Sequence, residues 1–382
     1  MIDILKEECC GCGACITACP QKCIQMEEDE EGFRYPIIEK NKCINCGLCN
    51  KSCPYLNTEE RGVENPVAMG IVNLNEEKSK YSSSGGFFPA IAEYIISKGG
   101  TVYGAVLTND CHSVNHIRVN SVYGLKDLYG SKYLQSDTKN SYFKVKNDLD
   151  DGLYVLFSGT PCQIAGLKTY LRKEYSKLIC VEVVCHGVPS SSVWRKYLDY
   201  IENKVGPRIS KVVFRDQKMK KNGGVLIMYI ENDKGHSYRA PSWQDPFYKL
   251  FLENKILRPH CYRCKYKKTH YLADFTIADF WGIQNIAPNF GEEGKVSLVI
   301  LNNEKAKRIF EDIKENLQFI ETDIDKALMS NPPYNESVNK SDDRDRFFKD
   351  NIQMSFAALK KKYSRLSLKE RVKVLLMRCG LY

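Results

Sequence analysis

Two runs of cysteine near the N-terminus constrain this chain more than any other feature. The first run has the spacing C-x2-C-x2-C-x3-C followed by proline, and the second run repeats that spacing, again followed by proline. In runs of this spacing, the fourth cysteine of each run ligates the cluster held by the other run. The sequence therefore predicts two 4Fe-4S clusters with interleaved ligands: Cys9, Cys12, Cys15 and Cys53 for one, and Cys19, Cys43, Cys46 and Cys49 for the other.

Two alternative explanations of these runs are zinc sites and a disulfide framework. Zinc sites usually pair two C-x2-C ends and need neither a third cysteine two residues on nor a terminal Cys-Pro. The first residues, MIDILKEECC, contain no apolar signal core, so we do not expect export. Most of the 17 cysteines are then expected to be metal ligands in a reducing compartment, and we predict a cytoplasmic protein.

Composition and charge narrow the function classes. A length of 382 residues allows two or three domains with a large core. The sequence contains no run of 18 apolar residues, so we predict no membrane span. The net charge of +9 is either a solvated surface or a preference for an acidic partner, such as a ferredoxin or an anionic substrate. No nucleic-acid-binding motif accompanies this charge, so we expect no nucleic-acid partner.

The chain divides into three predicted regions of an overall α+β fold. Residues 1–58 form a two-cluster bacterial ferredoxin domain, with a hairpin between the cysteine runs that turns near Glu31 and Gly32. A polar linker ends at Pro66, and residues 66–330 form a mixed α/β domain. Residues 331–382 form a basic, largely helical tail.

Residues 153–184 contain the clearest strand–helix–strand pattern. An apolar strand over 153–157 is followed by the loop SGTPC, a helix that begins at residue 163, and a second strand over 178–184. A unit this compact favours a parallel pair with a right-handed crossover. Both loops that follow the strands then emerge at the same carboxyl edge of the sheet, where such folds place their sites.

A second group of cysteines is expected at that edge. Cys162 and Cys185 follow the two strands, and Cys261 and Cys264 form a C-x2-C pair farther along the chain. The residues alone leave three readings open, namely a third 4Fe-4S cluster, a zinc or redox site, and unrelated core cysteines. We assign no role to the remaining cysteines, which are Cys10, Cys23, Cys111, Cys180 and Cys379.

Six motifs in one order resemble a known family. They are YSSSGGFFPAIAEYI, GSKYLQS, FSGTPCQIAGLKTYL, VCHGVPS, HCYRCKY and ADFTIADFWGI. Together they resemble the beta subunits of coenzyme F420-reducing hydrogenase and F420-linked formate dehydrogenase, and they are similar to 7-hydroxymethyl chlorophyll a reductase. The resemblance covers roughly residues 1–330. It implies that the mixed α/β domain binds FAD, that iron–sulfur clusters exchange electrons with the flavin, and that Cys162, Cys185, Cys261 and Cys264 hold a third cluster.

A bound flavin needs amides and hydroxyls for its pyrophosphate and charges near its redox edge. The candidates are Ser82, Ser83, Ser84, Gly85 and Gly86 before a helix, Lys132, the loop residues Ser158, Gly159 and Thr160, and Arg215 and Asp279. Each has a structural alternative. The Ser/Gly loop is also typical of a capped helix start, Lys132 of a surface lysine, Arg215 of a salt bridge and Asp279 of a turn cap.

His186 is the candidate acid–base group, because it lies beside Cys185 in a loop at the sheet edge and imidazole titrates near neutrality. A buried, hydrogen-bonded histidine is the alternative. In the tail, Ser367 to Glu370 is a capping-box pattern that opens a basic amphipathic helix with Val372, Leu375 and Leu376 on one face. This helix is expected either to pack on the domain or to contact a membrane surface or redox partner.

Together these features predict an iron–sulfur flavoprotein oxidoreductase. Electrons would pass from a ferredoxin-like protein or a small electron carrier through the clusters to FAD and then to a small organic substrate. This division of labour follows from chemistry, because cubane clusters exchange one electron and flavin handles one or two. The alternatives are an electron-relay subunit of a larger complex and an oxidoreductase of coenzyme F420.

Overall fold

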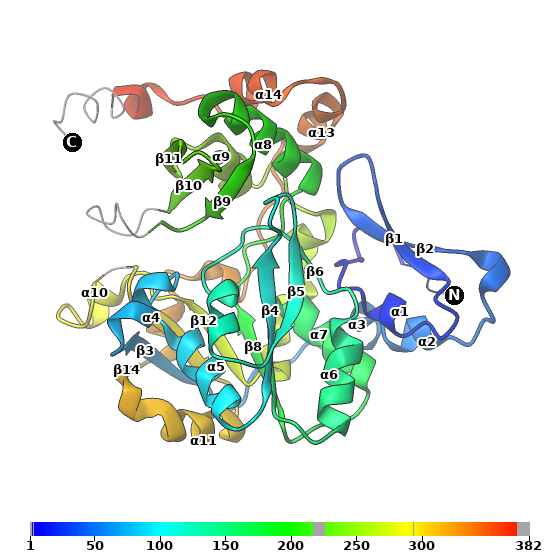
Figure 1. The fold of residues 1–382 in the computed structure, drawn as a ribbon, viewed down its shortest axis with the longest axis vertical. Coiled ribbons are helices and arrows are strands. Elements are labelled where there is room, and N and C mark those ends of the chain that lie inside the picture. The colour runs from blue at the N-terminus through cyan, green and yellow to red at the C-terminus, as the bar shows by residue number, and fades with distance from the viewer. Residues whose placement is uncertain (1, 3, 217–225, 293, 373–382) are drawn as a thin grey trace.

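The computed structural model describes residues 2, 4–216, 226–292 and 294–372. It confirms the α+β class, with a small N-terminal domain beside a larger body (Figure 1). In the N-terminal domain, β1 and β2 pair antiparallel, with Ile24 opposite Ile38, so the predicted hairpin is confirmed. The elements of this domain are α1 (Ala14–Thr17), β1 (Ile24–Glu28), β2 (Arg34–Ile38), η1 (Lys40–Lys42), α2 (Leu48–Lys51) and α3 (Pro54–Asn57).

A nine-stranded mixed sheet forms the centre of the body. Its strand order is β14-β3-β13-β12-β8-β7-β4-β5-β6. The four strands β12, β8, β7 and β4 are mutually parallel, and antiparallel pairs flank them. The strands are β3 (Val67–Asn73), β4 (Thr101–Leu107), β5 (Val114–Val119), β6 (Ser136–Asp137), β7 (Val155–Gly159), β8 (Leu178–Val183), β12 (Phe275–Asp279), β13 (Ser297–Leu301) and β14 (Leu317–Thr322).

The predicted parallel pairing of β7 and β8 is confirmed, and the pair extends farther than expected. Ser158 lies opposite Val181 and Gly159 lies opposite Glu182, so two residues expected in a loop belong to β7. The helix that follows also begins earlier, at Pro161. Thr160 supplies a capping box with Gln163, and proline suits the first helical position because it has no N–H to satisfy there.

Helices cover both faces of the sheet. Alternate residues of β7 point to opposite sides: Leu156 packs in the cluster that includes α5 and α11, whereas Val155 and Phe157 pack against α6 and α7. The remaining helical elements of this region are α4 (Glu76–Tyr81), α5 (Phe87–Ser97), η2 (Tyr123–Leu128), α6 (Ser141–Asp150), α7 (Pro161–Leu171), η4 (Pro259–Arg263), η5 (Lys265–Lys268), η6 (His270–Leu272), α10 (Ile283–Ile286), α11 (Glu304–Ile313), η7 (Lys314–Asn316), α12 (Ile324–Leu328) and η8 (Pro332–Tyr334).

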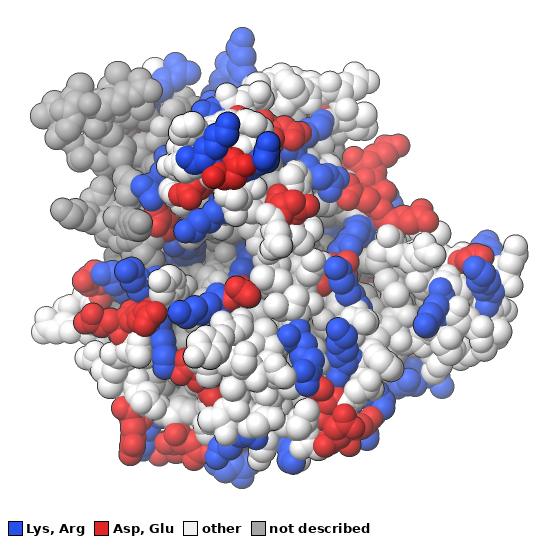
Figure 2. Space-filling view, viewed as in Figure 1, with Lys and Arg blue, Asp and Glu red and all other residues white. Residues whose placement is uncertain are grey.

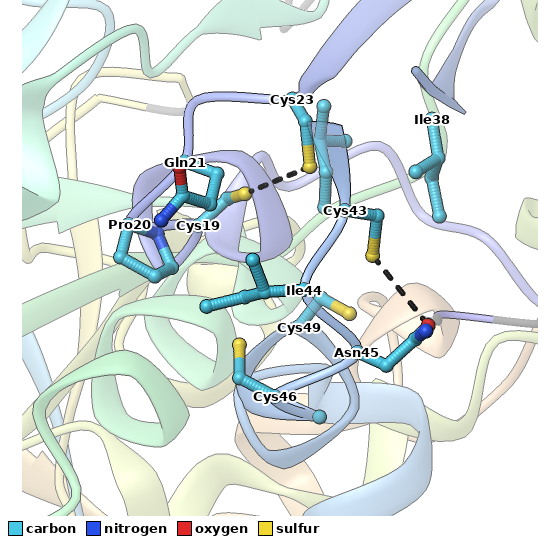
Figure 3. Close-up of a pocket in the computed structure, with 12 residues that line it drawn as sticks. Cys19, Pro20, Gln21, Cys23, Ile38, Cys43, Ile44, Asn45, Cys46 and Cys49 are labelled. Carbon is cyan, nitrogen blue, oxygen red and sulfur yellow. Dashed lines mark hydrogen bonds between the residues drawn. The ribbon is translucent and has the colours of Figure 1, made fainter. Parts of the chain in front are cut away.

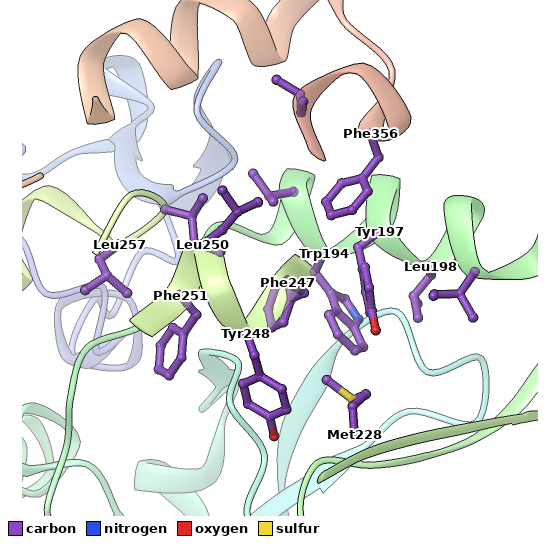
Figure 4. Packing of buried hydrophobic residues seen from close by; sticks show 14 of the residues in the cluster. Trp194, Tyr197, Leu198, Met228, Phe247, Tyr248, Leu250, Phe251, Leu257 and Phe356 are labelled. Carbon is purple, nitrogen blue, oxygen red and sulfur yellow. The ribbon is translucent and has the colours of Figure 1, made fainter. Parts of the chain in front are cut away.

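A second, three-stranded sheet with order β11-β10-β9 lies beside the main sheet (Figure 1). Figure 4 shows its aromatic core, where Trp194 and Tyr197 of α8 pack against Phe247 of α9 and Phe356 of α14. The elements are α8 (Ser191–Val205), β9 (Ile209–Val213), β10 (Ile227–Asn232), β11 (Ser237–Pro241), α9 (Pro246–Leu252), α13 (Arg344–Gln353) and α14 (Phe356–Tyr363). Among the described residues, none of the helices has the length and apolar character needed to span a bilayer.

The C-terminal region packs on the body as far as the structure describes it. Phe347, Leu359 and Tyr363 are buried in the same core as α8 and α9. The predicted capping box is present, because the Glu370 carboxylate accepts from the Ser367 amide at 2.7 Å and the Ser367 hydroxyl accepts from the Glu370 amide at 3.2 Å. The rest of that predicted helix, including Leu375 and Leu376, lies outside the described residues.

Candidate functional site

The first predicted ligand set surrounds one hollow within the N-terminal domain. Cys9, Cys12, Cys15 and Cys53 all line it, and each is only 5–8% exposed. Its empty volume, including the part open to solvent, is about 330 Å³. We call these four residues the proximal group, because they lie against the larger part of the molecule.

The second predicted ligand set surrounds another hollow, of about 350 Å³ on the same measure. Figure 3 shows Cys19, Cys43, Cys46 and Cys49 around it, together with Cys23, whose sulfur lies 3.4 Å from the Cys19 sulfur. Cys46 is exposed and Cys19 and Cys43 are partly exposed. We call the four predicted ligands the distal group, because they stand at the outer surface of the domain.

The two groups share one local backbone geometry. Gly13 caps α1 with φ +80°, and Gly47 caps α2 with φ +73°. Each glycine stands between the second and third cysteine of its run, where the chain must turn in the left-handed region before the helix carries the third cysteine back to the hollow. Residues with a Cβ rarely adopt that conformation, so glycine at both positions is a structural requirement.

Burial holds the thiols of the proximal group protonated in the metal-free chain. Desolvation raises the pKa of Cys9 and Cys15, and it raises the pKa of Cys53 to about 11. Metal ligation requires thiolates, so loading of such a site releases protons. Within the described part of the chain, no three His, Cys, Asp or Glu side chains converge on a point suited to one metal ion. The cysteines instead stand around hollows, as donors to a multi-atom cluster do.

Side chains of the body clamp the backbone of the proximal loop. Three successive contacts reach its carbonyls: Arg258 Nε donates to Cys9 O at 2.7 Å, Gln135 Nε2 to Cys10 O at 2.8 Å, and Thr138 Oγ1 to Cys12 O at 2.9 Å. Sequence analysis did not identify these three residues. They hold the buried loop in register with the body, so the position of the proximal group is fixed relative to the sheet.

The structure brings together the third set of cysteines, which we call the sheet-edge group. Burial raises the pKa of Cys261 and Cys264, and neighbouring thiolates raise it further because like charges repel at short range: Cys185 acts on Cys261, and Cys261 and Cys185 act on Cys264. The neighbouring Cys10 thiol raises the pKa of Cys162 most, and Cys264 and Cys185 raise it further. Cys10, to which we assigned no role, thus lies between the proximal and sheet-edge groups: Cys12 and Cys162 lower its pKa, and its sulfur donates to the Tyr266 hydroxyl at 3.7 Å.

A buried ammonium group accompanies the sheet-edge group. Lys267 is 5% exposed, and its Nζ donates to the backbone carbonyls of Cys185 and Pro333. No ion pair to Lys267 occurs among the described residues. A buried cation without a carboxylate partner is costly, so the setting suits a group that gains negative charge, as thiolates around a cluster do.

Several of the other predicted site residues lie where strands end at one edge of the main sheet. Because β3, β12, β8 and β7 run in one direction, the Ser/Gly loop after β3, the loop after β7 and His186 after β8 all lie at that edge. The prediction that the chain leaves β7 and β8 at one edge is confirmed, and the Ser/Gly loop lies at that edge too. Their roles toward a flavin stay predictions.

All three serine hydroxyls of the Ser/Gly loop have protein partners. Ser82 Oγ donates to Lys78 O at 2.8 Å, Ser83 Oγ accepts from the Ser131 amide at 2.6 Å, and Ser84 Oγ lies 2.9 Å from Ser297 Oγ. Gly85 packs so closely that a Cβ would meet Ile71 O at 2.0 Å. Gly86 caps α5 without any side-chain cap, which leaves the first-turn amides as the loop's candidate anion donors.

The charged side chains predicted to contact a flavin have polar partners within the protein. Lys132 Nζ donates to the carbonyls of Asp127 at 3.1 Å and Tyr129 at 2.8 Å, and desolvation lowers the pKa of Lys132 to about 7. Arg215 forms a buried ion pair with Asp279, which is the salt bridge that we gave as the structural alternative for Arg215. Thr160 serves the capping box of α7.

His186 is held by Asn254 and Phe251. Its Nε2 lies 2.8 Å from Asn254 Oδ1, and its ring centroid lies 5.0 Å from that of Phe251. Desolvation lowers the pKa of His186, which favours the neutral imidazole. Neutral imidazole with Nε2–H donating to the amide oxygen leaves Nδ1 as its proton acceptor.

Positive charge does not gather in one large patch on the visible face of the molecule. Figure 2 shows Lys and Arg interspersed with Asp and Glu across this view. Around the distal hollow, Ile44 is 60% exposed and Lys42 pairs with Glu39 at 2.8 Å. The surface around the distal group therefore combines apolar and charged side chains.

Comparisons with known proteins fit this arrangement. Residues 8–57 match the 4Fe-4S dicluster domain, which makes the chain an iron–sulfur redox protein. Residues 153–327 match the family described as the C terminus of the coenzyme F420 hydrogenase/dehydrogenase beta subunit, so the resemblance found in the sequence is confirmed. A chain of the xenon-derivatized F420-reducing NiFe hydrogenase complex from Methanosarcina barkeri aligns with 15% identity and a TM-score of 0.47, over 81% of this chain and 95% of that chain. The comparison with curated proteins gave no match.

Proposed function

We propose that this chain is an oxidoreductase that takes single electrons from a ferredoxin-like protein or a small electron carrier, passes them along 4Fe-4S clusters to FAD, and reduces a small organic substrate. The observation that carries the proposal is the order of the three cysteine groups. The distal group opens to solvent, the proximal group is buried against the body, and Cys10 separates the proximal group from the sheet-edge group.

The chain's residues fit these groups to different degrees. Eight cysteines around two hollows suit two clusters, and the sheet-edge group with buried Lys267 suits a third. When bound, clusters supply one-electron exchange and a flavin supplies the change to two-electron chemistry. First-turn amides of α5 are the proposed pyrophosphate donors. Nδ1 of His186 is the proposed site for holding a proton at the sheet edge.

Two alternatives have an observation in their favour. The family that residues 153–327 match is described by coenzyme F420, which favours an oxidoreductase of that deazaflavin. The same description names a beta subunit, which favours a relay within a larger complex. A cytoplasmic location stays a prediction from cysteine usage.

The test begins with anaerobic purification of the full chain and counts of iron, sulfide and flavin. About twelve iron per chain indicates three cubane clusters, and about eight indicates two. Cys261→Ser should lower the count by about four, whereas Cys180→Ser, which alters a buried cysteine of β8 outside all three groups, should leave it unchanged. A count of eight that Cys261→Ser does not change rejects the third cluster.

Activity separates the alternatives. The proposal expects bound FAD that is reduced when the clusters are reduced, with a reduced ferredoxin or with dithionite as the donor. Reduction or oxidation of coenzyme F420 by the isolated chain favours the deazaflavin alternative. A preparation with clusters but without flavin, able only to pass electrons between two proteins, favours the relay and refutes the proposal.

A further inference from the structure

One side chain of the body reaches the proximal group with a full positive charge. Arg258 is 1% exposed, and its Nη2 lies 3.7 Å from the Cys9 sulfur. The same guanidinium donates to the carbonyls of Cys9 and Arg34 and to Gln135 Oε1, at 2.7, 2.9 and 3.1 Å. Its carbon also lies 4.4 Å from the ring centroid of Tyr35. These contacts satisfy its N–H groups, but each oxygen that they reach is neutral.

Arg258 differs in this respect from the other buried arginines that the structure describes. Arg344 pairs with Glu31 and Arg215 pairs with Asp279, so each of those guanidinium groups has a carboxylate partner. No carboxylate pairs with Arg258 within the described residues, and the thiol that its guanidinium contacts there is that of Cys9. Burying an ion is costly unless an opposite charge compensates it, which makes the sulfur side of this contact the expected place for negative charge.

We propose that the buried guanidinium of Arg258 is the charge partner of the proximal cluster and raises its reduction potential above that of the distal cluster. The inference rests on the proposed function, because it needs a cluster at the proximal group. Each electron added to a cluster adds one negative charge, and a fixed buried cation stabilises that charge without taking up a proton. Arginine suits this task because it remains protonated throughout the working range of pH.

The distal group has no comparable partner among the described residues. The residues that line its hollow are cysteine, proline, glycine, isoleucine, asparagine and glutamine. Lysines near it, such as Lys42, are exposed, and water screens their charge. Glu8 lines the proximal hollow and opposes Arg258, but it is partly exposed and accepts from the Leu5 amide at 2.9 Å. The buried cation therefore dominates, and electrons that enter at the distal group move toward the higher potential.

The test is an anaerobic redox titration of the full chain, followed by the electron paramagnetic resonance signals of the reduced clusters. Arg258→Gln removes the charge and keeps much of the side chain's length. Arg258→Lys keeps the charge and loses the forked geometry. Arg344→Gln is the matched control, because it removes another buried guanidinium that ties the N-terminal domain to the body but is already paired with a carboxylate.

We expect Arg258→Gln to lower the equilibrium constant for reduction of one cluster at least tenfold, which is a fall of 59 mV for a one-electron couple. The affected cluster should be the one with the higher potential in the unaltered chain. Arg258→Lys should restore most of the shift, and Arg344→Gln should cause none. If Arg258→Gln loses four iron while Arg258→Lys keeps them, the charge is needed for the cluster itself, which also supports the proposal.

Three results overturn the inference. The first is full iron with unchanged potentials in Arg258→Gln. The second is an equal shift in Arg344→Gln, which would assign the effect to domain docking. The third is loss of iron from Arg258→Gln and Arg258→Lys alike, which would make shape the requirement. A chain that binds no clusters at all under anaerobic reconstitution instead rejects the proposed function, so the two failures are distinguishable.

Discussion

The ion pair between Glu31 and Arg344 tests how the N-terminal domain is held on the body. Glu31 lies in the turn between β1 and β2, and Arg344 is the first residue of α13. Nη1 and Nη2 donate to the two carboxylate oxygens at 2.9 and 2.5 Å. The Arg344 side chain is 5% exposed and the Glu31 side chain is 27% exposed. Arg344 also donates to the carbonyl of Leu257.

Two limits bracket the free energy of this contact. Exposed ion pairs contribute about 0.2–1 kcal/mol, and removing one partner of a buried pair costs about 3–5 kcal/mol. Glu31 keeps some contact with water, but Glu31→Gln leaves the buried Arg344 with the Leu257 carbonyl, aromatic neighbours and the exposed carboxylate of Asp345 at 3.6 Å. Because Glu31 is partly exposed and Asp345 partly compensates the guanidinium, we place the cost between these limits, at about 2 kcal/mol, which is about a 30-fold increase in the equilibrium for opening of the hairpin.

Hydrogen exchange of the β1 and β2 amides measures this opening directly in the folded chain. Glu31→Gln, Arg344→Gln and the double variant complete a cycle whose coupling energy should be about 2 kcal/mol. Glu28→Gln is the matched control on the same hairpin, because Glu28 pairs with Arg195 where both side chains are one-third or more exposed, and it should cost at most about 1 kcal/mol. A coupling energy below about 0.5 kcal/mol, or equal effects of Glu28→Gln and Glu31→Gln, would refute the reasoning.

Two further predictions concern His116 and Gly166. Burial lowers the pKa of His116 to about 4, and its Nδ1 has no partner. The unfolded chain therefore takes up the proton first, and the free energy of unfolding should fall by up to about 3 kcal/mol as pH drops from 6.5 toward 4. The urea midpoints of the unaltered chain and of His116→Gln should therefore converge near pH 4. In α7, a Cβ at Gly166 would lie 3.0 Å from the Cβ and sulfur of Cys12. Gly166→Leu should therefore lose about four iron by colorimetric assay, whereas Gly62→Leu, with open space around it, should lose none; full iron in Gly166→Leu would contradict the close approach.

Short-range rules explain what could be predicted from the sequence. The cysteine spacing predicted which four residues surround each hollow, because interleaved ligation follows from the ferredoxin motif alone. The strand–helix–strand pattern predicted the parallel pairing of β7 and β8 and so the meeting of Cys162 with Cys185. The end of β7 was displaced by two residues, because its pairing with β8 overrides the turn preference of Ser158 and Gly159.

No sequence pattern predicted the three side-chain contacts that hold the proximal loop on the body. Gln135 and Thr138 contact Cys10 and Cys12 across more than 120 residues of chain, and nothing periodic marks them. The contact of Arg344 with Glu31 is of the same kind, since the C-terminal region lies outside the motifs that resemble the family. Contacts of single polar side chains between domains depend on how the domains dock, and no local pattern specifies that docking.

Arg258 is a partial exception, and it shows how the missed residues could be found. Arg258, Cys261, Cys264 and Lys267 are spaced by three residues, and the chain between them forms the 3-10 helices η4 and η5. Side chains three residues apart in such helices lie on the same side. One short segment thereby delivers two sulfurs and two buried cations to the boundary between the proximal and sheet-edge groups. The pattern R-x2-C-x2-C-x2-K therefore carries two predicted ligands of the third cluster and the charge that we propose for the proximal cluster. Replacing Arg258 by a neutral residue should change the potential of the proximal cluster, and replacing Lys267 should change that of the third cluster. Neither replacement removes a cysteine ligand.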